Sequence, residues 1–378
     1  MIDDRPDSRA TRVLFVSSFV LPHAGGVEQF VETARGILAD RGCEVRVLAC
    51  RLPGNDATAD ASVPTRFLGR SGWPLPTGGW RRLWREVQWA DVVVANNSRH
   101  VLPVLAVLLA RLQSRGSIFV VHGSGEGPQT GSRAFRVVRA TFQRTLARRS
   151  IRVSRPVSVS RAGVAWIRRL YGVEAAYLPY PLRELPPVAA TPQLSADEPL
   201  RVVWVGRLFP EKDPALAVRA VERLRDERPA TLDVYGGGIL DSELVGLARL
   251  RPWLRLHGAC GWDEIQEIQA EAHLCLSTSV ADNVQVAVLE ALSRGIPVVS
   301  TRVGDASCYY LGGPLGRFCV APGDPDAIAD AILELCSSYP SYRDAFGRNG
   351  QQLTARHAEA PSVLGHLIAE SASRTGRR

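Results

Sequence analysis

The sequence predicts an α/β fold of two doubly wound domains, each built on a parallel sheet. Three observations support this prediction. The chain has 378 residues, more than one hydrophobic core usually supports. Short apolar runs alternate with stretches of helical spacing, as expected for parallel strands joined by right-handed crossovers. A segment rich in Pro and Ala, residues 185–198, separates two halves in which the alternation starts anew.

The first half opens with an expected buried strand at Arg12–Ser18, a run of branched apolar residues. Val27–Arg41 then has apolar residues at helical spacing, and Gly42 suits the left-handed residue that closes a helix. Short apolar runs predict the further strands of this half: Cys43–Cys50, Asp91–Ala95, Ser117–His122, Val157–Ser160 and Ala176–Pro179.

The second half repeats these signals. Its expected strands are Leu200–Val205, Thr231–Tyr235, Leu254–His257, His273–Ser277 and Ile296–Ser300, with helices at Pro214–Arg225, Trp262–Glu271 and Val286–Ser293. We therefore expect a first domain at 1–184, a linker at 185–198, a second domain at 199–358 and a C-terminal helix within 359–378. Packing of that helix back on the first domain is one option. Two such sheets would face each other across a cleft, with ligands at the C-terminal ends of the strands.

Charge is distributed unevenly along the chain. Residues 1–190 hold 27 Arg against 14 acidic residues, whereas residues 191–378 hold 19 basic against 24 acidic residues. No apolar run reaches the ~18 residues that a membrane-spanning helix needs, and the charged start, Met1–Arg12, does not resemble a signal peptide. The seven cysteines show no metal-ligand spacing, which favours free thiols and a cytoplasmic location.

A basic cluster, Gly206–Lys212, directly follows the first strand of the second half. A turn there would place Arg207 and Lys212 at the mouth of the sheet. A guanidinium and an ammonium group can hold a diphosphate and stabilise it as it leaves. An ordinary solvated turn between a strand and a helix would show the same spacing.

Two carboxylates, Asp282 and Glu290, flank the start of an apolar helix. Asp282 could bond sugar hydroxyls, while the helix start at Asn283, Val284 and Gln285 would offer N–H groups to a phosphate. Glu290 would suit the diol of a ribose. An N-cap Asp followed by a surface Glu is the alternative, which fits Glu290 poorly because its helix is strongly apolar.

Two glycine-rich loops and one histidine complete the candidate site. Gly25 and Gly26 lead from the first strand into a helix, where the backbone can approach a phosphate, and Gly236–Gly238 leaves room for a nucleoside. Both loops are equally typical of tight turns. His122 ends a strand at the same expected edge, so its position suggests function more than its residue type does. Asp324-Pro325-Asp326 fits helix capping better than metal binding. We expect neither a metal nor a cofactor.

Together these motifs resemble those of the retaining nucleotide-sugar glycosyltransferases of family 4, which have the GT-B fold of two Rossmann-like domains. The likeness covers almost the whole chain. It rests on the order of the following motifs: Gly25–Glu28, Gly206–Leu208 with Glu211-Lys212, Gly236–Gly238, Asp282 with Glu290-Ala291, Gly295–Val299 and Ala321–Pro325.

The resemblance implies a hexosyltransferase that uses a nucleotide sugar without metal and retains anomeric configuration. Attack from the same face, assisted by the departing phosphate, would rely on electrostatics and positioning. The implied roles are the donor diphosphate for Arg207 and Lys212, the nucleotide ribose for Glu290, and the donor sugar for Asp282. Gly25 and Gly26 would lie under the phosphate and His122 near the sugar, while the N-terminal domain would take the acceptor.

Three departures from the family pattern leave the donor open. Asp282 replaces a Glu, Val284-Gln285-Val286 replaces a Phe-Gly or Pro-Asn segment, and Gly304–Cys308 lacks the usual Glu. A nucleotide-sugar 2-epimerase of the same fold is one alternative, although it would need more acid and base groups in the cleft. A catalytically impaired protein that binds sugar nucleotides or anionic surfaces is another.

The acceptor is a glycan, a lipid-linked intermediate or a small molecule. The Arg-rich stretch Arg133–Arg155 and the Trp/Arg segment Trp80–Arg85 suit an anionic membrane surface, and peripheral contact with the inner membrane face is one interpretation. A solvated basic face is an equal one. Nucleic acid is not expected as a partner, because the basic stretch lacks interleaved aromatic residues and a recognised reading module.

Overall fold

The computed structural model describes residues 9–21, 25–52, 59–68, 73–97, 99–123, 132–187, 192–195, 198–311 and 313–373. The described residues form two compact units. Unit 1 holds those within 9–123, 132–181 and 359–373, and unit 2 holds those within 182–358. The described part of the predicted linker lies in unit 2 and forms neither helix nor strand.

Unit 1 is built on a seven-stranded parallel sheet with the order β3-β2-β1-β6-β7-β8-β9. The chain enters at the centre, winds outward to β3 and returns to the other side of β1. This order confirms the predicted doubly wound topology. The strands are β1 Arg12–Ser17, β2 Glu44–Cys50, β3 Ala61–Val63, β6 Val92–Asn96, β7 Gly116–Val121, β8 Arg155–Ser158 and β9 Ala176–Tyr177.

Helices cover the sheet of unit 1. They account for the continuous apolar strand sequences, because a parallel strand that is covered on both faces buries nearly every side chain, as β6 does. The helices are α1 Gly26–Asp40, α2 Trp80–Trp89, α3 Val101–Leu112, α4 Arg133–Phe142, α5 Arg148–Val153 and α6 Arg161–Tyr171, with a π-helical turn at Gln143–Ala147. An antiparallel pair, β4 Thr65–Leu68 and β5 Trp73–Pro76, was not predicted.

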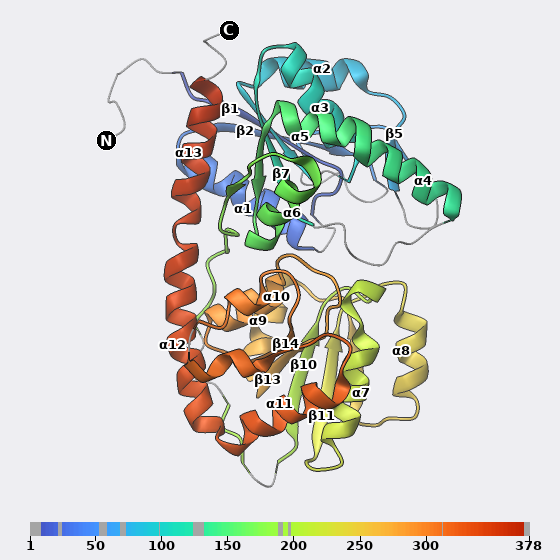
Figure 1. Ribbon diagram of the computed structural model, residues 1–378, viewed down its shortest axis with the longest axis vertical. Helices are drawn as coiled ribbons and strands as arrows, with labels where there is room; N and C mark the ends of the chain where they lie inside the picture. Colours follow the sequence, from blue (N-terminus) through green and yellow to red (C-terminus); the bar gives the residue numbers. More distant parts are fainter. Residues whose placement is uncertain are drawn as a thin grey trace. The chain divides into compact units, whose positions relative to one another are not determined.

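The C-terminal helix α13, Ala360–Ser373, packs on unit 1 against α1, β6 and β7 (Figure 1, dark red). The contact is close enough to require glycine at the start of β7. A Cβ on Gly116 would lie 2.4 Å from the carbonyl oxygen of Ser371. An ion pair between Arg155 and Glu370 joins the same helix to β8.

Unit 2 repeats the topology with six parallel strands in the order β12-β11-β10-β13-β14-β15. From β10 the chain adds strands outward on one side, to β12, and then returns to the other side of β10 with β13, so the strand order reverses between β10 and β13. The strands are β10 Leu200–Val205, β11 Ala230–Tyr235, β12 Leu254–Gly258, β13 Leu274–Ser277, β14 Val298–Thr301 and β15 Cys319–Val320. The helices are α7 Pro214–Leu224, α8 Asp241–Ala248, α9 Trp262–Glu271, α10 Val286–Ser293, α11 Pro325–Ser337 and α12 Tyr339–His357.

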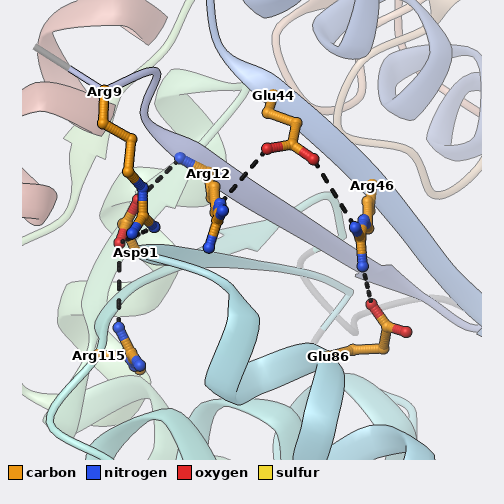
Figure 2. Close-up of polar contacts among 7 residues, drawn as sticks. All are labelled: Arg9, Arg12, Glu44, Arg46, Glu86, Asp91 and Arg115. Atoms are coloured by element: carbon orange, nitrogen blue, oxygen red, sulfur yellow. Dashed lines mark hydrogen bonds and ion pairs between the residues drawn. The ribbon is translucent and has the colours of Figure 1, made fainter.

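A chain of ion pairs crosses the N-terminal ends of the strands in unit 1 (Figure 2). Asp91 accepts a hydrogen bond from the backbone N–H of Arg12 at 2.9 Å and pairs with Arg9 at 3.3 Å. Glu44 pairs with Arg12 at 3.4 Å. Farther along, Arg46 bonds Glu86 at 3.3 Å, and Arg115 lies 3.9 Å from Asp91. These exposed pairs engage scarce acidic residues at the edge opposite the C-terminal ends of the strands.

No described helix is both long and apolar enough to cross a membrane.

Candidate functional site

A cavity of about 30 Å³ lies in unit 2 at the C-terminal ends of β10 and β13, where the sheet order reverses. Lys212, Ser277, Ser279 and the first turn of α10 line it. No side chain caps the start of α10, so its first N–H groups remain available on the cavity side. Ligands of open α/β sheets bind at such reversal points.

Lys212 is held in place by the loop that follows β13. It ends a short 3₁₀-helix, Pro210–Lys212, and its carbonyl oxygen lies 3.1 Å from the Thr278 hydroxyl. That hydroxyl also lies 2.7 Å from the carbonyl oxygen of Asp213 and accepts a hydrogen bond from the indole of Trp204 at 3.0 Å. The backbone N–H of Val280 bonds the Glu211 carbonyl at 2.9 Å. The two loops therefore form one bonded assembly.

This assembly brings two of the predicted site residues into direct contact. The Lys212 ammonium pairs with an oxygen of Asp282, and the two side chains are only 22% and 17% exposed. The other Asp282 oxygen accepts from the backbone N–H of Asn283 at 2.9 Å. Partial burial strengthens such a pair relative to one in water. An ammonium group and a carboxylate thus lie side by side, next to the cavity that Lys212 lines.

Arg207, the third predicted site residue, makes looser contacts and does not line the cavity. Its guanidinium is 55% exposed, sits 3.6 Å from Glu211 and stacks 5.2 Å from the centre of the Phe209 ring. An exposed pair of this kind contributes little to stability. The side chain can therefore exchange its partner for a ligand at low cost.

Gln285 and Asn283, predicted to contact the donor, are buried at the helix start. The Gln285 side chain accepts from the Ser277 hydroxyl at 2.5 Å and donates to the Thr301 carbonyl at 3.0 Å, which ties β13 to β14. Val284 is also buried. The Gln285 side chain thus stabilises the sheet, and the contribution of this residue to the start of α10 comes from its backbone.

Glu290 lies inside unit 2 with 4% of its surface exposed. Its Oε1 accepts from the Trp262 indole at 2.9 Å, and its Oε2 accepts from the Gln266 amide at 3.3 Å. Sequence reasoning missed both donors. Trp262 and Gln266 are four residues apart, and the buried Gln269 follows on the same face of α9. This row of polar groups on one helix face is the signal that could have predicted the two donors.

The loop Gly236–Gly238 packs closely within unit 2, and its role in binding a nucleoside stays a prediction. A Cβ on Gly236, where φ is +149°, would lie 1.8 Å from the carbonyl oxygen of Gly206, and one on Gly238 would lie 2.4 Å from that of Leu208. The N–H of Gly236 bonds Gly258 at 2.7 Å, and that of Gly238 bonds Asp241 at 2.9 Å. The missing side chains admit the protein's own backbone, because the two loops pack directly against each other.

In unit 1, His122 lies beyond the C-terminal end of β7 and bonds the Asn96 side-chain oxygen at the end of β6. The Asn96 amide nitrogen donates to Ser17 at 3.3 Å and Val27 at 3.4 Å, so its oxygen faces the imidazole and requires the proton on Nε2. Burial lowers the pKa of His122 to about 3. The ring is therefore neutral, and Nδ1 is its acceptor.

Gly25 and Gly26 stand at the start of α1, on the same edge of unit 1 as His122. The Glu28 carboxylate lies over Gly25, 2.4 Å from where a Cβ would stand, and the Tyr180 hydroxyl donates to the Gly26 carbonyl at 2.7 Å. Phe30 packs edge-on to the imidazole at 4.8 Å. His23 and Ala24 of this loop lie outside the described residues.

Asp324 confirms the capping interpretation. Its side chain accepts from the backbone N–H groups of Asp326 and Ala327 at 3.1 and 3.0 Å and so begins α11.

Two family models match the chain. Residues 199–338 match "Glycosyl transferases group 1", and residues 24–178 match "Glycosyltransferase Family 4". Glycogen synthase of Mycobacterium tuberculosis is 26% identical over 296 residues, which span 74% of this chain and 67% of that protein. A human phosphatidylinositol N-acetylglucosaminyltransferase polypeptide is 24% identical over 385 residues, which span 96% of this chain and 73% of that protein.

Solved structures share the fold. Anabaena HepE in complex with UDP superposes with a TM-score of 0.70 at 15% identity, over 96% of this chain and 100% of that one. Sucrose-phosphate synthase of Thermosynechococcus elongatus superposes with a TM-score of 0.73 at 17% identity, over 95% and 98% of the two chains.

Gly236→Ala should destabilise the protein by about 2 kcal/mol or more, because the methyl group must displace backbone in the adjoining loop. The neighbouring Gly237→Ala is the matched control, since the nearest atom to its Cβ is 4.0 Å away. Urea unfolding measures both free energies. Equal stability of the two variants would contradict the packing described for these loops.

His122→Gln should flatten the pH dependence of stability. The folded pKa of about 3 lies below the ~6.5 of an unfolded histidine, so the stability that His122 contributes is present above pH ~6.5 and falls as the pH drops towards 3. Between about pH 7.5 and 5, the unfolding free energy of the wild type should fall by up to about 2 kcal/mol more than that of the variant. Identical losses, measured by urea unfolding, would exclude this.

Proposed function

We propose that this chain, a glycosyltransferase of the GT-B fold, moves a hexose-type sugar from a nucleoside diphosphate sugar to an acceptor, with retention and without metal. The observation that carries the proposal is the cavity in unit 2, where an ammonium group and the uncapped start of α10 converge. Both are suited to a diphosphate. The proposal places the enzyme in the cytoplasm.

The diphosphate is the charged part of the donor, and its leaving is the step that needs stabilisation. Lys212 supplies a compact positive charge at the cavity, and the first turn of α10 supplies N–H groups and the positive end of its dipole. Arg207, exposed and loosely paired, closes on the phosphate from solvent. These groups stabilise the charge that develops on the leaving oxygen.

Asp282 takes part through its pair with Lys212. When a diphosphate competes for the ammonium, the carboxylate loses its cation and gains the capacity to accept hydroxyl groups of the donor sugar. Charge balance thus couples phosphate binding to sugar binding. Retention follows from attack on the same face as the departing phosphate, which accepts the proton of the acceptor hydroxyl.

The donor and the acceptor are proposed by class. Because related solved structures hold UDP and UDP-glucose, these two ligands are the first to test. The acceptor is a glycan, a lipid-linked intermediate or a small molecule. Product analysis separates transfer from the alternatives, since a 2-epimerase would change the sugar of the nucleotide and an impaired binding protein would release no sugar.

Peripheral contact with an anionic membrane is proposed through α4, which extends from unit 1 (Figure 1). Val137 and Val138 are 60% and 54% exposed on this helix. Four exposed arginines lie on α4 and on the helical turns that follow it: Arg133, Arg136, Arg144 and Arg149. Within the described residues no ion pair engages these arginines. Exposed valines between arginines favour a lipid surface, because purely electrostatic partners gain nothing from them.

Lys212→Ala and Arg207→Ala should each lower kcat/KM for transfer by about a hundredfold or more, because each removes a cation from the departing diphosphate. Both variants should fold; without ligand Arg207→Ala should keep the wild-type melting temperature, whereas Lys212→Ala should lower it, because the half-buried Asp282 carboxylate loses its cation. UDP should raise the melting temperature of the wild type and fail to raise that of Lys212→Ala. Arg249→Ala, an exposed arginine of unit 2 outside the cavity, is the control. Near-normal turnover in either site variant would refute the diphosphate site.

Arg136→Glu with Arg144→Glu should abolish flotation with vesicles that contain phosphatidylglycerol, because each arginine near such a surface contributes about 1 kcal/mol. Vesicles of phosphatidylcholine alone should bind neither protein. Arg249→Glu with Leu250→Asp changes an exposed basic and an exposed apolar residue of unit 2 and should float like the wild type. A wild type that stays unbound to anionic vesicles at moderate salt would reject membrane contact.

A further inference from the structure

We infer that Trp262 is a positioning residue for the nucleoside end of the donor: it aligns the Glu290 carboxylate so that the site discriminates a ribose from a 2′-deoxyribose. The inference rests on the proposed function and on the role in holding the nucleotide ribose that the family resemblance implies for Glu290. It adds a residue that the motifs do not contain.

The carboxylate of Glu290 is fixed at both oxygens. Trp262 Nε1 donates to one at 2.9 Å, and Gln266 Nε2 donates to the other at 3.3 Å. A bond from an N–H group to a buried carboxylate is charge-assisted and stronger than a neutral one. With a donor on each oxygen, the plane of the carboxylate cannot rotate without breaking a bond.

The two donors are themselves anchored. Trp262 begins α9, and the Arg183 guanidinium stacks over its ring at 4.1 Å from the centre. Gln266 is one turn later on the same face of α9, and both its backbone and side-chain oxygens accept from Arg294, at 2.7 and 3.1 Å. Arg294 also donates to the carbonyl of Pro186 at 3.0 Å. The hydrogen-bond donors that orient the Glu290 carboxylate are therefore themselves held by further hydrogen bonds and by ring stacking.

The two hydrogen-bonded residues Glu290 and Trp262 differ in their exposure to solvent. Glu290 is 4% exposed, whereas Trp262 is half-buried and reaches the surface of unit 2. A nucleoside that approaches the carboxylate therefore meets the indole. A pre-oriented acceptor raises the affinity for a ligand with a hydroxyl at this position, because no side-chain freedom is lost when the hydrogen bond forms. Removing the indole N–H would release one carboxylate oxygen of Glu290 and reduce the affinity gained from the ligand hydroxyl.

The test compares affinities for UDP, GDP and ADP with those for their 2′-deoxy counterparts, by isothermal titration. The wild type should favour the ribonucleotide of its preferred base by about tenfold or more. Glu290→Gln should lose this preference. Trp262→Phe, which keeps the ring and removes the N–H, should reduce it to about threefold or less, and should raise the donor KM while kcat changes little.

Trp253→Phe is the matched control, because Trp253 lies in the same unit and also stacks with an arginine, Arg225, at 5.4 Å. It should keep the wild-type preference. Gln266→Leu removes the second donor and should shift the preference in the same direction as Trp262→Phe, which keeps the test valid should the tryptophan variant fail to fold.

The outcomes separate the two ideas. Loss of preference in Glu290→Gln with full preference in Trp262→Phe and Gln266→Leu overturns the positioning role and leaves the ribose site standing. An unchanged preference in Glu290→Gln overturns the ribose site itself. Binding of none of the nucleotides overturns the proposed function. Reduced preference in Trp262→Phe, with Trp253→Phe unchanged, supports the inference.

Discussion

The bond between the loops that follow β10 and β13 is the constraint on which the site of unit 2 depends. In a doubly wound sheet the connections on either side of the reversal point run to opposite faces, and β10 and β13 are the paired strands at that point. Thr278 bonds the carbonyls that end the first loop, and Val280 bonds Glu211 beside it. Lys212 consequently stands against Asp282 and the start of α10, where a solvated lysine would otherwise move freely.

Close packing of glycine against backbone is the second requirement of this arrangement. The loop after β11 can lie on the loop after β10 only because Gly236 and Gly238 carry no side chain. These two glycines therefore bring neighbouring strand ends together. The same geometry appears in unit 1, where Gly116 lets the backbone of α13 approach β7.

Polar side chains in both units are oriented by partners that are distant in sequence. Asn96 dictates the tautomer of His122, and burial keeps that ring neutral. Trp262 and Gln266 orient Glu290. In each case a bond to a fixed neighbour offsets the cost of removing a polar group from water, and the same bond sets the direction in which the group can act.

The sequence by itself determined the two doubly wound domains, since apolar runs and helical spacing are local signals that follow from burial on both faces of a sheet. It also indicated Arg207 and Lys212 at the mouth of the second sheet, because they directly follow its first strand, and Asp282 separately at the start of an apolar helix. Tertiary structure alone decided that Lys212 pairs with Asp282 and that Trp262 holds Glu290. Those contacts join residues 70 and 28 positions apart. Their geometry depends on the packing of whole loops and helices, which no local pattern encodes.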